Sequence, residues 1–297
     1  MEKRNHKDSL FIDLFCKDQK SGKENFISLY NALHQTNLNL ETTTLEEVNI
    51  ENILYMALSN DIAMLVDGRL VVLVEHQSTI NENMPLRLLE YVSRIYEQLV
   101  PSEDRYEKKM IKIPYPEFYV FYNGTEEYPV EKELRLSDAF ILPDNKYSKD
   151  KKISLEILVK VININIDKEN PILNQCRALQ EYSTLIELIR ETKRQNPKAP
   201  LEEALSKAIN DGILEEYLKR KSTEVRNMLI AEYSYETDIK VQRREAFRLG
   251  KEEGAEQKAI ETAKNLLTMN LSLEQIAQAT SLPLEKIQEL EKETIQN

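Results

Sequence analysis

The sequence has few of the residues that cross-link small proteins or hold metals through sulfur and nitrogen. Its 297 residues include only two cysteines, Cys16 and Cys176, which stand far apart and outside any CxxC pair. A disulfide scaffold and a zinc site are therefore not expected. The three histidines, His6, His34 and His76, are equally scattered and predict no metal cluster.

Long apolar runs are also missing. No stretch of about 18 apolar residues occurs, so no transmembrane helix is expected, and the opening MEKRNHKDS lacks the apolar core of a signal peptide. We therefore expect a cytoplasmic protein with no membrane partner. Acidic residues outnumber basic residues, which gives the chain a net charge of −11. Contact with nucleic acid would thus depend on local groups of Lys and Arg rather than on the total charge.

The most informative stretch covers residues 61–79. Two β-rich segments, Asp61–Val66 and Arg69–Gln77, flank an Asp67-Gly68 pair, which is a common hairpin turn. Both segments are almost wholly apolar, as in central strands that are covered on both faces. The pattern therefore predicts a hairpin inside the sheet of an α/β protein.

Three polar residues interrupt this apolar hairpin: Asp61, Glu75 and Gln77. A carboxylate on a buried strand costs several kcal/mol unless it is paired, hydrogen-bonded or bound to a cation. With a two-residue turn, Asp61 pairs with Val74 and lies on the face opposite Glu75. A three-residue loop with a bulge pairs Asp61 with Leu73 instead, beside Glu75 and within reach of a shared cation. A site formed by both acids therefore requires the three-residue loop, with His76 pointing to the other face.

Asp61 and the Glu75-His76-Gln77 triplet resemble the D…ExK signature of the PD-(D/E)XK nuclease superfamily, with glutamine where lysine usually stands. Three further segments resemble the recombination-promoting nuclease (Rpn) family, also called putative transposases: residues 60–99, FYNG at 121–124, and GKEEG at 250–254. The resemblance covers nearly the whole chain. It implies an α/β, restriction-endonuclease-like core with a mixed β-sheet flanked by helices, followed by an all-helical C-terminal extension.

In such nucleases two acids and a strand carbonyl hold Mg²⁺. The resemblance thus implies a metal site formed by Asp61, Glu75 and the backbone carbonyl of His76, with Gln77 orienting the attacking water. Asp8 precedes an apolar helical stripe and is either an N-cap alone or a cap that also approaches the metal. The implied reaction is Mg²⁺-dependent hydrolysis of DNA phosphodiester bonds, linked to recombination or mobile-element activity.

DNA is the implied partner, and two pairs of basic residues are candidates for binding it. Arg87 and Arg94 lie beside the apolar stripe of a helix expected at Met84–Leu99, and Lys108 and Lys109 lie in a charged loop. Each pair is either a solvated surface or a set of phosphate contacts.

The rest of the chain suggests three parts. We expect a nuclease core over residues 1–170, a helical extension over 171–237, and a charged helical neck with a small helical module over 238–297. Capping boxes are expected at 21–24 and 272–275, strands at 118–122 and 153–166, and irregular structure at 125–152. The last two helices suggest a helix-turn-helix, but the second is acidic, which favours packing or homo-oligomerisation over DNA reading.

Two other interpretations remain open. Because Gln77 carries no charge, the chain could be a catalytically weak or inactive nuclease-fold protein that acts as a DNA- or partner-binding module. In a purely structural interpretation, the acids pair with Arg87 or Arg94 and the helical tail mediates assembly.

Overall fold

The computed structural model describes residues 9–48, 61–77, 80–141, 153–196, 199–269 and 271–295. Side chains are described throughout these ranges except at 61, 72–77, 232–243, 245, 246, 249, 252, 253, 256 and 292–295. The chain forms two compact units, Met1–Ile230 and Ala231–Asn297.

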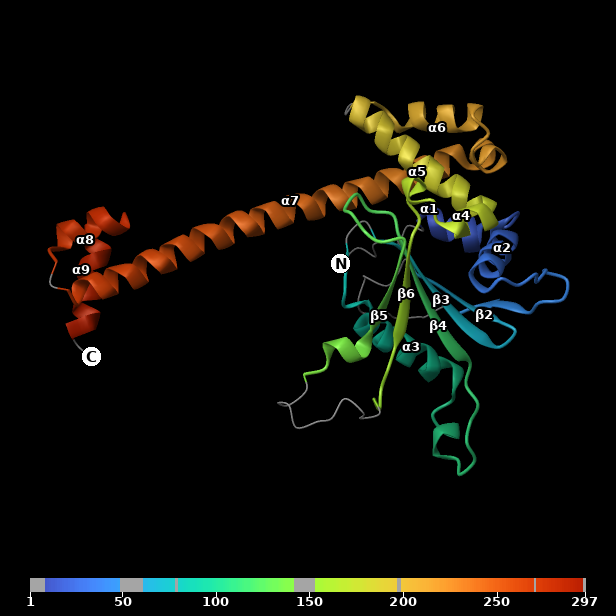
Figure 1. Cartoon of the computed structure of the whole chain (residues 1–297), viewed down its shortest axis with the longest axis horizontal. Helices are drawn as coiled ribbons and strands as arrows, with labels where there is room; N and C mark the ends of the chain where they lie inside the picture. The colour runs from blue at the N-terminus through green and yellow to red at the C-terminus, as the bar shows by residue number, and fades with distance from the viewer. Residues whose placement is uncertain are drawn as a thin grey trace. The chain divides into compact units, whose positions relative to one another are not determined.

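A mixed β-sheet forms the centre of the first unit (Figure 1). Within the described residues it has six strands in the order β1-β2-β3-β4-β6-β5. The strands are β1 (Leu45–Glu47), β2 (Asp61–Val66), β3 (Arg69–Gln77), β4 (Tyr115–Tyr122), β5 (Glu131–Arg135) and β6 (Leu158–Asn163). β3, β4 and β6 run parallel, whereas β1, β2 and β5 pair antiparallel with their neighbours. The predicted hairpin β2–β3 is confirmed, and it lies inside the sheet.

Helix α3 (Met84–Leu99) covers one face of the sheet. Pro85 stands in its first turn, where the missing N–H costs no intrahelical bond. Its buried side chains, Leu88, Tyr91 and Ile95 among them, share a core with Val120 of β4. The amphipathic helix expected here is therefore confirmed.

The other face is covered by helices from both ends of the unit. α1 (Leu10–Ile12) continues into the π-helical turn η1 (Asp13–Lys17), and α2 (Gly22–His34) follows. The Phe11 ring lies 5.4 Å from Phe121 of β4 and 5.5 Å from Tyr182 of α5 (Arg177–Gln195). The N-terminal segment is thus held between the sheet and the helices that follow it.

Two capping predictions at this end were wrong. The N-cap of α1 is Ser9, whose side chain accepts a hydrogen bond from the Ile12 amide, rather than Asp8, which lies outside the described residues. Ser21 makes no side-chain cap to α2. Its amide and hydroxyl donate to Asp18 Oδ2, at 3.1 and 2.7 Å, so the amide that a capping box would pair with Glu24 is already used.

Strands β5 and β6 also differ from what the sequence predicts. β5 lies within the stretch expected to be irregular, because its alternation is hidden among charged residues and Leu134 is its buried side chain. β6 is shorter than the predicted strand, and the 3₁₀ turns η3 (Asp104–Tyr106), η4 (Leu136–Ala139) and η5 (Ile166–Lys168) lie in the connections.

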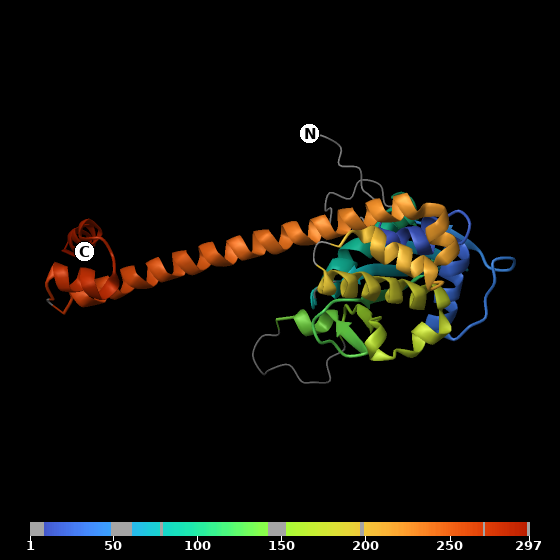
Figure 2. The same cartoon turned by 90° about the horizontal axis from the view of Figure 1, so that it is seen from above.

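The helices after the sheet begin at Asn170, whose side chain caps α4 (Pro171–Gln175). Cys176, which has extended dihedrals, separates α4 from α5. α6 (Leu201–Asn210) packs on α5, and both views show them side by side (Figure 2). α7 (Glu215–Leu267) begins next, is non-helical at Lys221, and continues through Gly250 and Gly254.

The second unit contains the last part of α7 with α8 (Leu273–Thr280) and α9 (Leu284–Ile295). Ala263, Ile276, Ile287 and Leu290 form its core. The capping box at Ser272 is confirmed, because Ser272 and Gln275 exchange both hydrogen bonds. Among the described helices, none is both long and apolar enough to cross a lipid bilayer.

Candidate functional site

The carboxyl edge of the parallel strands is the candidate site. Gln77 of β3 pairs with Tyr122 of β4, which pairs with Asn163 of β6, so all three strands end at the same level. β2 is antiparallel and starts at this edge, with Asp61 opposite Val74. Ligands of open α/β sheets bind outside the carboxyl ends of parallel strands.

The hairpin turn contradicts the three-residue loop that the sequence led us to require. Val66 pairs directly with Arg69, so the turn has two residues, Asp67 and Gly68, with φ values of 47° and 82°. Positive φ at both positions matches the right-handed twist of the flanking strands. Because the twist sets this preference, the two-residue turn forms and Asp61 pairs with Val74 rather than Leu73.

A β-bulge occurs further along β3. Three steps from Val74 to Gln77 correspond to two steps from Val120 to Tyr122 on β4. One extra residue in a strand shifts the alternation of its two faces by one. In a regular hairpin, the alternation of side chains puts Asp61 and Glu75 on opposite faces. Because of the bulge, this alternation does not continue unchanged beyond Val74.

The side chains predicted to form the metal site are not among those that the structure describes. The backbone of Asp61 and of Glu75, His76 and Gln77 is described, but their side chains are not, and Asp8 lies outside the described residues. Their assignment as metal ligands and water-orienting group therefore stays a prediction. Among the side chains that are described, no three His, Cys, Asp or Glu groups gather as a metal site.

A cluster of amides, which the sequence did not reveal, lies at the same edge. Asn163 Nδ2 donates to the Tyr128 carbonyl at 3.0 Å, and Asn165 Nδ2 donates to the Gly124 carbonyl at 3.0 Å. Asn170 Nδ2 donates to the Asn163 carbonyl at 3.3 Å. These bonds tie the segments after β4 and β6 to each other.

Arg190 of α5 completes this amide cluster. Its Nη1 donates to the side-chain oxygens of Asn123 and Asn165, at 2.9 and 3.0 Å, and its Nη2 donates to the Asn123 carbonyl. The half-buried guanidinium is thus held by neutral amides, and Glu187 Oε2 lies 3.7 Å from its Nη1 as a partial counter-ion. The carboxyl edge thus has a fixed positive group beside the end of β4.

One donor in the cluster has no partner. Asn123 is 1% exposed, and its Nδ2 makes no hydrogen bond with the described part of the chain. A buried unpaired donor costs about 1–3 kcal/mol. Such a group calls for an explanation, because buried polar atoms are nearly always satisfied.

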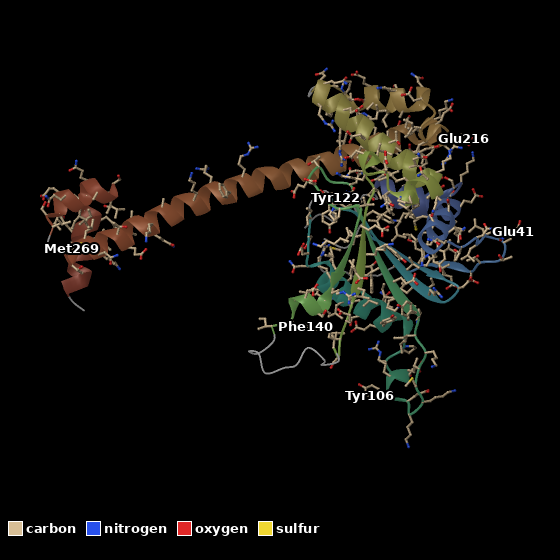
Figure 3. All side chains as sticks on the ribbon, in the orientation of Figure 1. Glu41, Tyr106, Tyr122, Phe140, Glu216 and Met269 are labelled. Carbon is tan, nitrogen blue, oxygen red and sulfur yellow. The ribbon has the colours of Figure 1, made fainter. Side chains whose placement is uncertain are left out.

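The basic candidates lie on helix α3 and in the loop before β4. Arg94 is exposed on α3, and Arg87 is half-buried there, with Nη1 3.3 Å from Met84 Sδ. Lys108 and Lys109 are exposed in the loop before β4, beyond Tyr106, at the opposite end of the sheet from Tyr122 (Figure 3). The eight residues of β4 separate these ends by about 23 Å at 3.3 Å per residue. The loop packs against the last turns of α3, because Ser93, the neighbour of Arg94, lines the same pocket as Lys108 and Lys109.

A second polar cluster joins the N-terminal segment to the start of α7. Lys221 Nζ lies 2.8 Å from Asp13 Oδ2 and 3.2 Å from Asp18 Oδ1, and Tyr217 donates to Asp13 at 2.6 Å. Arg220 donates to both oxygens of Asp18, at 2.7 and 2.8 Å, and holds the pKa of that carboxyl well below its usual range. Two acids neutralised by two cations serve as a structural clamp rather than a metal site.

A third cluster lies at the amino end of β4. His34 Nε2 is 2.6 Å from Glu117 Oε2 and its Nδ1 is 2.9 Å from the Tyr30 carbonyl. The Tyr119 hydroxyl lies 3.2 Å from His34 Nε2, and burial, followed by the nearby Glu117 charge, raises the Tyr119 pKa above its usual range. These contacts fasten the end of α2 to the sheet, far from the carboxyl edge.

Comparison with known proteins gives one family. The family model described as "Putative transposase, YhgA-like" matches residues 5–210. This match covers the whole sheet and α5. It ends before Tyr217, Arg220 and Lys221, which bind Asp13 and Asp18. No curated protein and no solved structure matches the chain.

Proposed function

Because the chain belongs to the YhgA-like family of putative transposases, we propose that it is a metal-dependent DNA endonuclease with a PD-(D/E)XK-type core. The observation that carries this proposal is the backbone register at the carboxyl edge. The first residue of β2, Asp61, pairs with Val74, and the Glu75-His76-Gln77 segment follows directly on β3. The acids of the resemblance therefore belong to neighbouring strands at one edge of the sheet.

The proposed ligands suit Mg²⁺. Asp61, Glu75 and the carbonyl of His76 all supply oxygen, the donor that hard divalent cations prefer, and Asp8 is a further candidate. When bound, such a metal lowers the pKa of a water molecule and stabilises negative charge on a phosphate.

The remaining steps belong to the chain's own residues. The Gln77 amide would hold the attacking water in line with the phosphorus, because it offers both a donor and an acceptor. Arg87 and Arg94 would bind phosphates beside the cut. Lys108 and Lys109 would contact the phosphate backbone further along the duplex.

Plasmid nicking tests the proposal. Supercoiled plasmid is incubated with the full chain in millimolar Mg²⁺ or in EDTA, with Asp61→Ala and Glu46→Ala prepared identically. Glu46 is an exposed acid on β1 and is the matched control. We expect Mg²⁺-dependent nicking by the wild type and by Glu46→Ala, and none by Asp61→Ala. Equal nicking by all three preparations, or none in Mg²⁺ by the wild type, would overturn the proposal.

A further inference from the structure

The loop between α3 and β4 exposes large apolar side chains. Tyr106 is 89% exposed, Met110 is 79% exposed and Ile113 is 50% exposed. Figure 3 shows Tyr106 where this loop projects beyond the sheet. Single exposed apolar residues are common on protein surfaces, but several of them on one projecting loop are typical of a surface that binds another molecule.

The loop is held in place at both ends. Arg105 Nη2 donates to the carbonyls of Glu97 and Val100, at 2.8 and 2.9 Å, and so binds the end of α3. The Tyr96 hydroxyl of α3 donates to the Pro114 carbonyl at 2.7 Å. The exposed side chains between these anchors are therefore presented by a fixed backbone, which reduces the conformational entropy lost when the loop binds a partner.

The charge of this segment is opposite in sign to that of the chain. Residues 106–113 contain three lysines and one glutamate, which gives a net charge of +2, whereas the whole chain carries −11. The lysines are exposed; Lys108 and Lys109 come directly before Met110, and Lys112 follows it. An apolar side chain with cations on both sides matches the minor groove of DNA, where base edges lie between two phosphate backbones.

The position of the loop favours DNA over a lipid surface. Ser93 of α3 lines the same pocket as Lys108 and Lys109. Arg94, the next residue of α3, is exposed, so the cations of the loop continue onto this helix. A duplex extends along a protein surface and can contact both elements, whereas a loop that inserts into lipid makes its contact through the tip.

We propose that Met110 enters the minor groove of the bound duplex and wedges between two base pairs, while the three neighbouring lysines hold the phosphates on both sides. This inference rests on the proposed function and adds a residue that bends the substrate. An inserted apolar side chain unstacks one base step and kinks the duplex. Methionine suits this role, because its unbranched side chain adapts to an irregular gap.

The preference for a weakened base step tests this assignment. Wild type, Met110→Ala and Met269→Ala are titrated in EDTA with two short duplexes of equal length, one fully paired and one with a central abasic site. Met269 is the matched control, because it is a methionine of the second unit and is 69% exposed. Dyes at the two ends of each duplex report bending by energy transfer.

An abasic site lowers the cost of unstacking that a wedge must overcome. We therefore expect wild type and Met269→Ala to bind the abasic duplex about tenfold more tightly than the paired duplex and to bend it. Met110→Ala should bind the two duplexes within about twofold of each other and without bending, because no side chain is buried between the bases. Met110→Leu, which conserves the side-chain volume, should keep the preference. Because Met110 is exposed, each variant should melt near the wild-type temperature.

The outcomes separate this inference from the proposed function. A Met110→Ala variant that keeps both the preference and the bending would overturn the role of Met110 and leave the nuclease proposal intact. A wild type that binds the two duplexes equally, or binds neither, would also overturn it. Co-sedimentation with vesicles of anionic phospholipid covers the lipid alternative. Vesicle binding that Met110→Ala abolishes, with duplex binding unchanged, would assign the loop to a lipid surface instead. A wild type that prefers and bends the abasic duplex but never nicks DNA in Mg²⁺ would refute the nuclease proposal and support the role of Met110.

Discussion

Removing Arg220 should destabilise the first unit by a measurable and pH-dependent amount. The side chain of Asp18 is 0% exposed, and Arg220 binds both of its oxygens. Removing one partner of a buried ion pair costs about 3–5 kcal/mol. In Arg220→Met, Lys221 at 3.2 Å from Asp18 and the two bonds from Ser21 remain, and the wild-type Arg220 side chain is already 35% exposed. We therefore expect a loss of about 2 kcal/mol, less than that full range.

The assay is thermal unfolding followed by circular dichroism. A loss of about 2 kcal/mol corresponds to a drop of roughly 4–8 °C for a domain of this size. The matched control is Arg226→Met on the same helix, because Arg226 pairs with Glu202 at the surface, where both side chains are about half exposed. Exposed pairs contribute about 0–1 kcal/mol, so this variant should melt close to wild type.

The pH dependence has a defined sign. Arg220 depresses the pKa of Asp18 in the folded state, so the stabilisation is fully present above the unfolded pKa of about 3.9 and is lost as the pH falls towards the folded pKa. The gap in melting temperature between wild type and Arg220→Met should therefore be constant from pH 7 to 5 and narrow below pH 4. Equal melting temperatures of wild type and Arg220→Met at pH 7, or a difference that widens in acid, would refute the stabilising role of the Asp18–Arg220 ion pair.

The other predictions concern the carboxyl edge. Gln77→Lys, which restores the residue usual in PD-(D/E)XK nucleases, should retain or increase nicking. Gln77→Leu should abolish nicking at an unchanged melting temperature. Equal nicking by wild type and both variants would show that Gln77 only fills space. Two carboxylates brought together repel, so millimolar Mg²⁺ should raise the melting temperature of wild type more than that of Glu75→Ala, and an identical response would mean that Glu75 binds no metal.

Local patterns in the sequence predicted the central elements well. The apolar runs around Asp67-Gly68 gave both strands of the hairpin, and the 3.6-residue stripe after Pro85 gave α3. The capping box at Ser272 formed as expected. Each of these signals is contained within a few residues, so no distant contact is needed to interpret it.

Register and long-range polar contacts could not be predicted in the same way. The bulge before Gln77 appears only where β3 pairs with β4, a strand that is distant in the sequence. The bond from Arg190 to Asn123 spans 67 residues, and that from Lys221 to Asp13 spans 208. A sequence shows Asn123 only as part of a strand-ending Asn-Gly pair, which gives no sign that an arginine of α5 lies beside it. The capping box at Ser21 fails for a local reason, because Asp18, three residues earlier, accepts a hydrogen bond from the Ser21 amide that the box would pair with Glu24.

The central claim is that acids from β2 and β3 act together in one site, and single-turnover cleavage rates test it most directly. Rates are measured in Mg²⁺ for wild type, Asp61→Asn, Glu75→Gln and the double variant, after each is shown to melt near the wild-type temperature. Residues that act as a unit give non-additive losses. The account predicts that each single change lowers the rate about a hundredfold or more and that the double variant is no slower than the slower single variant. A wild-type rate in either single variant, or losses that multiply in the double variant, would contradict it.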